Sequence, residues 1–175
     1  SVPLAATYWV GDESFNAAAL IVVELATDEG ITGLATIHGR SMKTVCEMLT
    51  GLQDLISGMD PMAHETIWAK IFSLTISSPD PSRPYVNNAL FGKHNRTQLM
   101  AALAAIDIAL WDIKGKALKL PIWRLLGGTR TALPAYVTCG YYQSDRDHMA
   151  LSDEMAGYVA QGFTAIKQIG CRERV

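Results

Sequence analysis

The chain has 175 residues, 49% of them hydrophobic and 18% charged, and a formal net charge of −2 at pH 7. This composition suffices for an apolar core, and the absence of a basic run argues against a nucleic-acid or membrane surface. No apolar stretch approaches the roughly 20 residues that span a bilayer. The N-terminus lacks the basic start of a signal peptide, and the three cysteines show neither disulfide nor zinc-site spacing. We therefore expect a cytoplasmic protein that binds neither nucleic acid nor membrane.

Residues 20–37, LIVVELATDEGITGLATI, predict a β-hairpin. The residues Asp28, Glu29 and Gly30 supply the turn, in which glycine can adopt a positive φ without strain. Both faces of the first strand are apolar near its start, so we expect another element to cover each face.

Two helices are predicted to follow the hairpin. Ser41 is placed to cap the first, which carries apolar residues at helical spacing as far as Ile56. Asp60 and Pro61 are predicted to open the second, because the missing N–H of proline costs little at the first helical position. The apolar face of this second helix comprises Ile67, Trp68, Ile71 and Phe72. Residues 77–96 predict a long polar loop, of a length typical of functional or mobile segments.

A long alanine-rich helix is predicted next, with Thr97 as its cap. Its apolar stripe comprises Leu103, Ile106, Leu110, Ile113 and Ala117, at spacings of three and four. Asp112 and Lys116 are four residues apart, so we expect an ion pair on the solvent-facing side. Pro121 ends the helix, because the residue before a proline is displaced from the α region.

The pattern changes after residue 128. A strand is predicted from Leu133, an amphipathic helix over 145–161, and a second strand from Phe163. The inward residues of this helix are predicted to be Met149, Met155, Val159 and Ala160. Strand, helix and strand within about 40 residues indicate a βαβ unit with parallel strands and a right-handed crossover. Two parallel strands do not complete a sheet, so the sequence is expected to be cut short.

Residues 104–128, AAIDIALWDIKGKALKLPIWRLLGG, closely resemble the first sequence motif of the mandelate racemase/muconate lactonizing enzyme family, part of the enolase superfamily. The matching residues are Asp107, Ala109, Asp112, Gly115, Lys116, Pro121, Leu125, Leu126 and Gly127. The resemblance extends to the VPLA segment at 2–5 and to the hairpin, and so covers almost the whole chain. It implies an α+β fold. Residues 1–128 would form an enolase-like N-terminal capping domain, a β-meander then helices, and 129–175 the first βαβ of an incomplete TIM-type barrel.

The resemblance implies abstraction of the α-proton of a carboxylate, as in racemases, dehydratases and cycloisomerases. The substrate would be a small carboxylate or an acid sugar. This chemistry needs a base beside the carbon and positive charge beside the carboxylate, which Mg²⁺ supplies in the superfamily. The metal ligands of the family lie on later barrel strands, so we expect none in this chain. The alternative is a folded but catalytically inactive truncated domain that acts only in binding or association.

Lys167 is the catalytic residue that the resemblance implies. The family usually carries Lys-x-Lys on the second barrel strand, and Lys167 matches the first lysine. Ile169 stands where the second lysine is expected, unless one residue is missing at this point. A truncation or a change of reading frame near residue 168 is therefore a further hypothesis.

Two capping-domain segments close over the barrel mouth in the family and set specificity. They correspond to a loop over residues 5–16 and to residues 38–40. Tyr8, Trp9 and His38 are therefore the expected substrate-binding residues, where aromatic side chains would exclude water. The alternative for Tyr8 and Trp9 is that they simply cover the meander. Exposed strand edges of a partial barrel favour a homo-oligomer.

Overall fold

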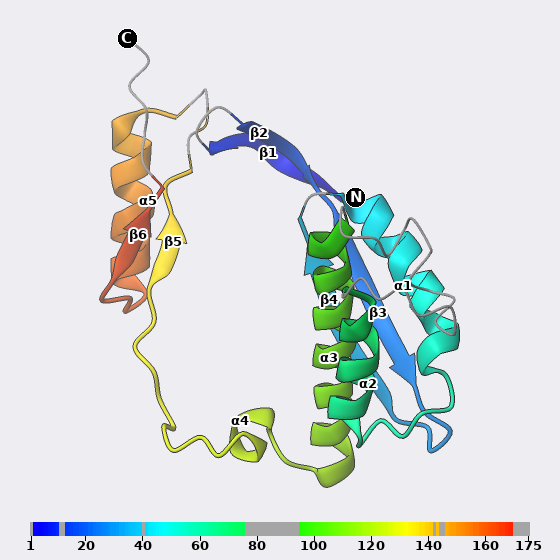
Figure 1. Cartoon of the computed structure of the whole chain (residues 1–175). Coiled ribbons are helices and arrows are strands. Elements are labelled where there is room, and N and C mark those ends of the chain that lie inside the picture. Colours follow the sequence, from blue (N-terminus) through cyan, green and yellow to red (C-terminus); the bar gives the residue numbers. More distant parts are fainter. Residues whose placement is uncertain are drawn as a thin grey trace. The chain divides into compact units, whose positions relative to one another are not determined.

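A computed structural model describes residues 2–10, 13–39, 41–75, 95–141, 143 and 146–169 (Figure 1). Most of the loop expected at 77–96 lies outside these residues. The elements are β1 (Val2–Val10), β2 (Glu13–Ala18), β3 (Leu20–Ala26), β4 (Thr32–His38), α1 (Met42–Ile56), α2 (His64–Phe72), a 3-10 turn (Ser73–Thr75), α3 (Arg96–Leu118), α4 (Ile122–Leu125), β5 (Val137–Cys139), α5 (His148–Ala160) and β6 (Ile166–Gln168).

The chain divides into two compact units, which are described separately. One spans residues 19–129, and the other combines residues 1–18 with 130–175. The boundary predicted between residues 128 and 129 for the capping domain and the barrel stays a prediction. The mixed α+β fold class is confirmed, because strands and helices occur in the predicted order.

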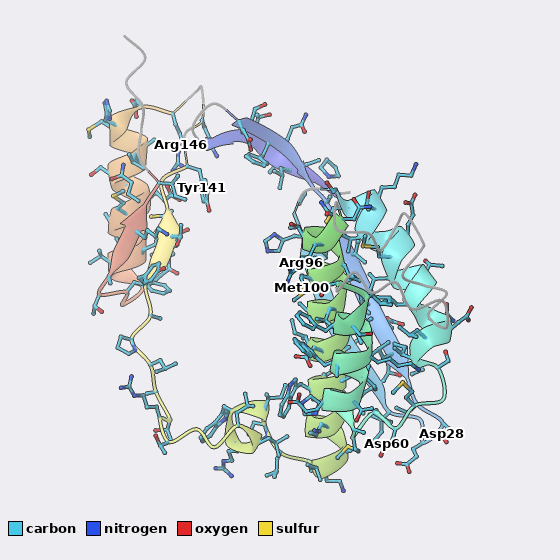
Figure 2. All side chains as sticks on the ribbon, viewed as in Figure 1. Asp28, Asp60, Arg96, Met100, Tyr141 and Arg146 are labelled. Carbon is cyan, nitrogen blue, oxygen red and sulfur yellow. The ribbon has the colours of Figure 1, made fainter. Side chains whose placement is uncertain are left out.

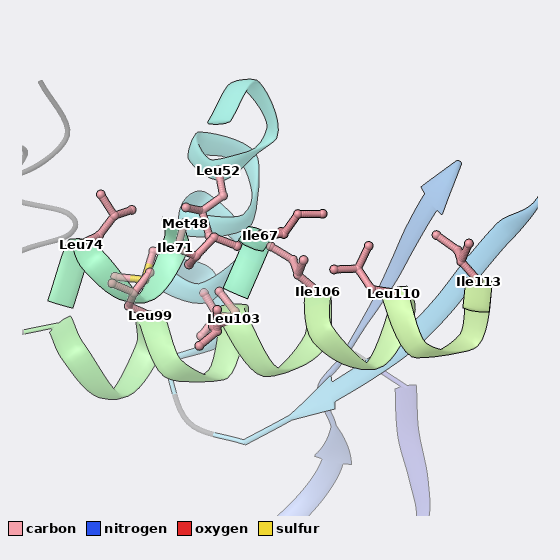
Figure 3. Packing of buried hydrophobic residues seen from close by; sticks show 12 residues of the cluster. Met48, Leu52, Ile67, Ile71, Leu74, Leu99, Leu103, Ile106, Leu110 and Ile113 are labelled. Carbon is pink, nitrogen blue, oxygen red and sulfur yellow. The ribbon is translucent and has the colours of Figure 1, made fainter. Parts of the chain in front are cut away.

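The core of the 19–129 unit is formed by α1, α2 and α3 together with one face of the β3–β4 hairpin (Figures 1 and 3). Its buried members include Met48, Leu52, Ile67, Ile71, Leu99, Leu103, Ile106, Leu110 and Ile113. The predicted stripe of α3 is therefore confirmed from Leu103 to Ile113, whereas Ala117 is exposed. Burial of each large aliphatic side chain stabilises the fold by about 1.5–3 kcal/mol.

The hairpin β3–β4 is confirmed and packs closely on α3. Val23 pairs with Ala35, and both are buried against α3. Gly33 occupies the tightest point, because a Cβ there would lie only 2.1 Å from the carbonyl oxygen of Ala109. Gly30 has a φ of 79° in the turn, as predicted. This packing buries alternate residues of both strands, which is the pattern of a sheet covered on one side.

The other face of this hairpin is exposed. Leu20 is 53% and Val22 56% exposed, and Leu34 lies on the same face. A covering element was expected on both faces, but the described residues of this unit cover only the face that packs on α3.

The helix starts differ from the predicted ones. Ser41 is the N-cap of α1, but it has a left-handed backbone and its side chain makes no capping hydrogen bond. Asp60 does not open α2, which begins at His64. Instead Asp60 Oδ1 accepts a hydrogen bond of 2.8 Å from the Met62 N–H in the turn before the helix (Figure 2). Thr97 lies inside α3, which begins one residue earlier.

The first 18 residues contain a further hairpin, in which β1 pairs antiparallel with β2. The segment expected as a loop at 5–16 therefore consists largely of strand, with a register shift between Pro3 and Tyr8. Among the described residues the strands pair as three two-stranded sheets, β1–β2, β3–β4 and β5–β6. None of the described helices has the length and apolar character needed to cross a bilayer.

Candidate functional site

The strands β5 and β6 form the parallel pair that the βαβ pattern predicts. Thr138 pairs with Lys167 and Cys139 with Gln168. The Ile169 N–H continues this ladder by donating a hydrogen bond of 3.0 Å to the carbonyl oxygen of Cys139. Lys167 is thus the central residue of β6, and it lies beside Thr138 on the neighbouring strand.

Helix α5 connects the two strands and packs on β5. Asp147 caps it by accepting a hydrogen bond of 2.8 Å from the Ala150 N–H. Arg146, labelled in Figure 2, forms an ion pair of 2.8 Å with Glu154 in the second turn of the helix. These two contacts stabilise the N-terminal half of α5.

The inward face of α5 differs from the predicted one. Met149 is 69% and Val159 59% exposed, and Ala160 is also exposed. The half-buried side chains are Ala150, Leu151, Glu154, Met155 and Tyr158. Only Met155 of the predicted set therefore lies on the covered side. The apolar residues of this helix fall on both sides, so periodicity does not define its inward face.

Cys139 marks the face of β5 that is covered by α5. Its side chain is buried, with 2% exposed. Burial raises the pKa of the Cys139 thiol, and the nearby Glu154 carboxylate of α5 raises it further. The thiol therefore stays protonated at neutral pH and is not an activated nucleophile.

Thr138 and Lys167 lie on the opposite face, because successive side chains of a strand alternate between the two faces. Both residues are exposed. In a β/α barrel the helices form the outer ring and the opposite strand faces point inward. Lys167 therefore occupies the face that would line a barrel interior. The sequence analysis did not predict that Thr138 lies beside Lys167. Alternation along the predicted strand could have indicated it, because Thr138 shares a face with Tyr136, two residues earlier.

The expected substrate-binding residues lie on the other strands. His38 is the last residue of β4, where it pairs with Leu20 and is exposed on the outer face of the hairpin. Tyr8 and Trp9 lie in β1, opposite Phe15 and Ser14. The side chains of Tyr8 and Trp9 lie outside the described atoms, so their substrate contacts stay a prediction.

A cluster between α2 and α3 was not predicted. Lys114 Nζ lies 2.7 Å from His64 Nδ1, and the His64 ring faces Trp111 at a centroid distance of 4.6 Å. Burial raises the pKa of the nearby Asp107 carboxyl, while electrostatic interactions with His64 and Lys114 oppose this rise. Asp107, Trp111 and Lys114 recur at spacings of four and three, so the sequence did signal that they share one face of α3.

Within the described parts of the chain, no group of three or more His, Cys, Asp or Glu side chains is placed to hold a metal ion. The described residues by themselves therefore do not provide a site that fits Mg²⁺.

Comparisons with known proteins agree with this architecture. Residues 5–127 match the family model described as the mandelate racemase/muconate lactonizing enzyme, N-terminal domain. Arabinonate dehydratase from Saccharolobus solfataricus is 32% identical over 160 residues, which are 87% of this chain and 38% of that protein. D-galactonate dehydratase from Pectobacterium atrosepticum is 35% identical over 86% of this chain and 35% of its own length.

A racemase from Streptomyces coelicolor A3(2), solved with bound magnesium, superposes with a TM-score of 0.75 at 25% sequence identity. The match covers 95% of this chain and 43% of the racemase. The fold is thus that of an enolase-superfamily capping domain with the start of a barrel. The chain belongs to the mandelate racemase/muconate lactonizing enzyme family. It spans less than half the length of these relatives.

Proposed function

We propose that this chain supplies the capping domain and the first two barrel strands of an enzyme that removes the α-proton of an acid sugar. The reaction that fits its relatives is dehydration, because the curated relatives described above are an arabinonate and a galactonate dehydratase. Removal of the proton next to the carboxylate, followed by loss of the β-hydroxyl as water, would give the 2-keto-3-deoxy acid after tautomerisation.

The position of Lys167 carries the proposal. It lies on the face of β6 that is turned away from the covering helix, where a barrel gathers its inward side chains. A lysine amine there can accept a proton or hold a carboxylate by charge, and these are the two tasks that enolate chemistry requires. Lys167 is therefore proposed as an acid/base or carboxylate-orienting residue.

Ile169 bears on the first of these tasks. It follows Lys167 by two residues on the ladder, where the family usually has a second lysine, and its side chain cannot exchange a proton, so proton transfer at these two positions is proposed to fall to Lys167. Catalysis by this protein then depends on Lys167 together with groups that later strands would contribute. Mg²⁺ belongs to the proposal as the cofactor of the whole enzyme, as in the magnesium-bound racemase.

His38, Tyr8 and Trp9 are proposed to contact the substrate. His38 ends β4 and is followed by a bend at Gly39, so it lies where a strand gives way to a connecting segment. Tyr8 and Trp9 are proposed to cover the substrate from β1 and exclude water.

Exchange of the α-hydrogen tests this function. The protein that carries this sequence is incubated in D₂O with Mg²⁺ and a panel of acid sugars, including arabinonate, galactonate and mannonate. We expect α-deuterium or a 2-keto-3-deoxy product with at least one of them, detected by NMR and mass spectrometry. Absence of exchange and of product across acid sugars, mandelate-like acids and muconate would favour the alternative of an inactive binding domain.

A further inference from the structure

A chain of polar contacts connects α2 to α3 through the ring of His64. Lys114 Nζ on α3 lies 2.7 Å from Nδ1, and the Glu65 carboxylate lies 3.3 Å from Nε2. The ring itself packs against Trp111, and the Lys114 ammonium lies 4.8 Å from the centroid of that indole. The His64 side chain is only 12% exposed, so these contacts replace most of its water.

These contacts select one form of the imidazole. An ammonium group can only donate hydrogen bonds, so Nδ1 must accept from Lys114. The ring hydrogen then resides on Nε2, on the side of the Glu65 carboxylate. The neutral Nε2–H form therefore accepts from Lys114 at Nδ1 and carries its hydrogen on the nitrogen beside Glu65. An imidazolium carries a hydrogen on each nitrogen and cannot accept from Lys114.

We propose that His64 and Lys114 form a proton-sensitive latch between α2 and α3. The latch is closed while the ring is neutral. When a proton from solvent binds Nδ1, the hydrogen bond from Lys114 is lost and the ammonium moves away from the ring and from Trp111. Acidification, which supplies this proton, is therefore the condition that tests the latch.

The charges around His64 stabilise the open state of the latch, in which the ring is protonated and Lys114 has moved away. Among the described residues, Glu65 on its own helix and Lys114 on α3 contact the ring, and Asp107 on α3 interacts with it electrostatically. The two carboxylates attract an imidazolium, and the ammonium repels it. Protonation thus removes the hydrogen bond from Lys114 and strengthens the attraction of the ring to the two carboxylates.

This inference concerns the 19–129 unit and does not depend on the proposed reaction. The test is NMR of the folded protein at about pH 8 and about pH 5.5, which bracket histidine titration. We expect a nuclear Overhauser contact between the Lys114 side-chain methylenes and the Trp111 ring at the higher pH, and its loss or a severalfold weakening at the lower one. Long-range ¹H–¹⁵N spectra should show hydrogen on Nε2 of His64 and none on Nδ1 at the higher pH.

Two variants distinguish the latch from a general effect of pH. His64→Gln keeps an acceptor for Lys114 but does not titrate, so the contact should persist at both pH values. His38→Gln removes an exposed histidine of β4 and should behave as the parent protein does. An unchanged contact in the parent protein, hydrogen on Nδ1 at the higher pH, or equal loss in His64→Gln would each overturn the proposal. The first two results need no variant to fold.

Discussion

The carboxylate of Asp112 accepts a hydrogen bond of 2.9 Å from the Leu34 N–H, across 78 positions of sequence. Lys116 completes a clamp, because its Nζ lies 2.5 Å from Asp112 Oδ2 and 2.6 Å from the carbonyl oxygen of Thr32. Two residues of the family motif thus join α3 to β4, in addition to pairing with each other as predicted.

Loss of the Asp112 carboxylate should loosen this clamp. Asp112→Ala leaves the Leu34 N–H and the Lys116 ammonium without their acceptor, and hydrogen bonds to charged groups contribute about 1.5–3 kcal/mol. We expect the free energy of unfolding, measured in urea, to decrease by an amount within this range. The decrease should lie towards the lower end because Asp112 is partly exposed. Glu47→Ala, at an exposed position of α1, should change it by less than about 0.5 kcal/mol. Equal effects of the two substitutions would contradict the clamp.

The same carboxylate makes stability depend on pH. The hydrogen bond from Lys116 is the largest cause that lowers the pKa of Asp112 below its ordinary value of 3.8, and the Leu34 N–H adds to it. The folded state then binds this proton less readily than the unfolded state does. The contribution of Asp112 to the free energy of unfolding is complete above about pH 3.8, the pKa of the unfolded state. It disappears as the pH falls through the lower pKa of the folded state.

Asp112→Asn removes this contribution, since an amide does not titrate in this range. Urea unfolding measured over the acid range should therefore show a larger loss of stability for the parent protein than for Asp112→Asn. Asp107, with its raised pKa, is common to both proteins and cancels in the comparison. Parallel pH profiles of the two proteins would show that Asp112 carries no such linkage.

Gly33 should not tolerate a side chain. The Cβ of an alanine would lie 2.1 Å from the Ala109 carbonyl oxygen and 2.7 Å from Ile113 Cγ1, so α3 and β4 would have to separate. We expect Gly33→Ala to destabilise the 19–129 unit by about 3 kcal/mol, the upper end of overpacking effects. Gly157→Ala is a suitable control, because nothing lies within 4 Å of that site in α5. It should be neutral or stabilising by up to about 1 kcal/mol. A near-native melting temperature for Gly33→Ala would refute the close packing.

Two cysteines should differ in reactivity. Cys46 is exposed on α1, whereas Cys139 is buried and its thiol pKa is raised by burial. Because the thiolate is the reactive form, iodoacetamide should modify Cys46 in the native protein and leave Cys139 largely intact. Peptide mapping after a short reaction measures both sites, and a urea-unfolded sample provides the control for full reactivity. Similar native rates at the two sites would show that α5 does not cover β5.

Local periodicity predicted the elements well where one period dominates. The stripe from Leu103 to Ile113 is buried because residues three and four apart share one face of a helix whatever lies against it. The turn at Gly30 followed from backbone conformation, which is also a local property. In α5 the apolar side chains lie on both faces, so Met149 and Val159 were placed wrongly.

Contacts between distant segments could not be predicted in the same way. The bond from Leu34 to Asp112 and the contact of Lys114 with His64 join residues 78 and 50 positions apart. Helix starts also depend on competing local hydrogen bonds, and Asp60 binds the Met62 N–H in a turn instead of capping α2. The role of Lys167 rests on the family resemblance, to which the structure adds its position beside Thr138.

Substitution of Lys167 tests the central claim most directly. Lys167→Met and Lys43→Met are compared for α-hydrogen exchange on the acid sugar that gives the strongest signal; Lys43 is an exposed residue of α1. Acid/base groups contribute about 10²- to 10⁴-fold to rates. We predict a loss of this size for Lys167→Met, with a native-like circular dichroism spectrum, and an unchanged rate for Lys43→Met. Exchange by Lys167→Met at the parent rate would contradict the account.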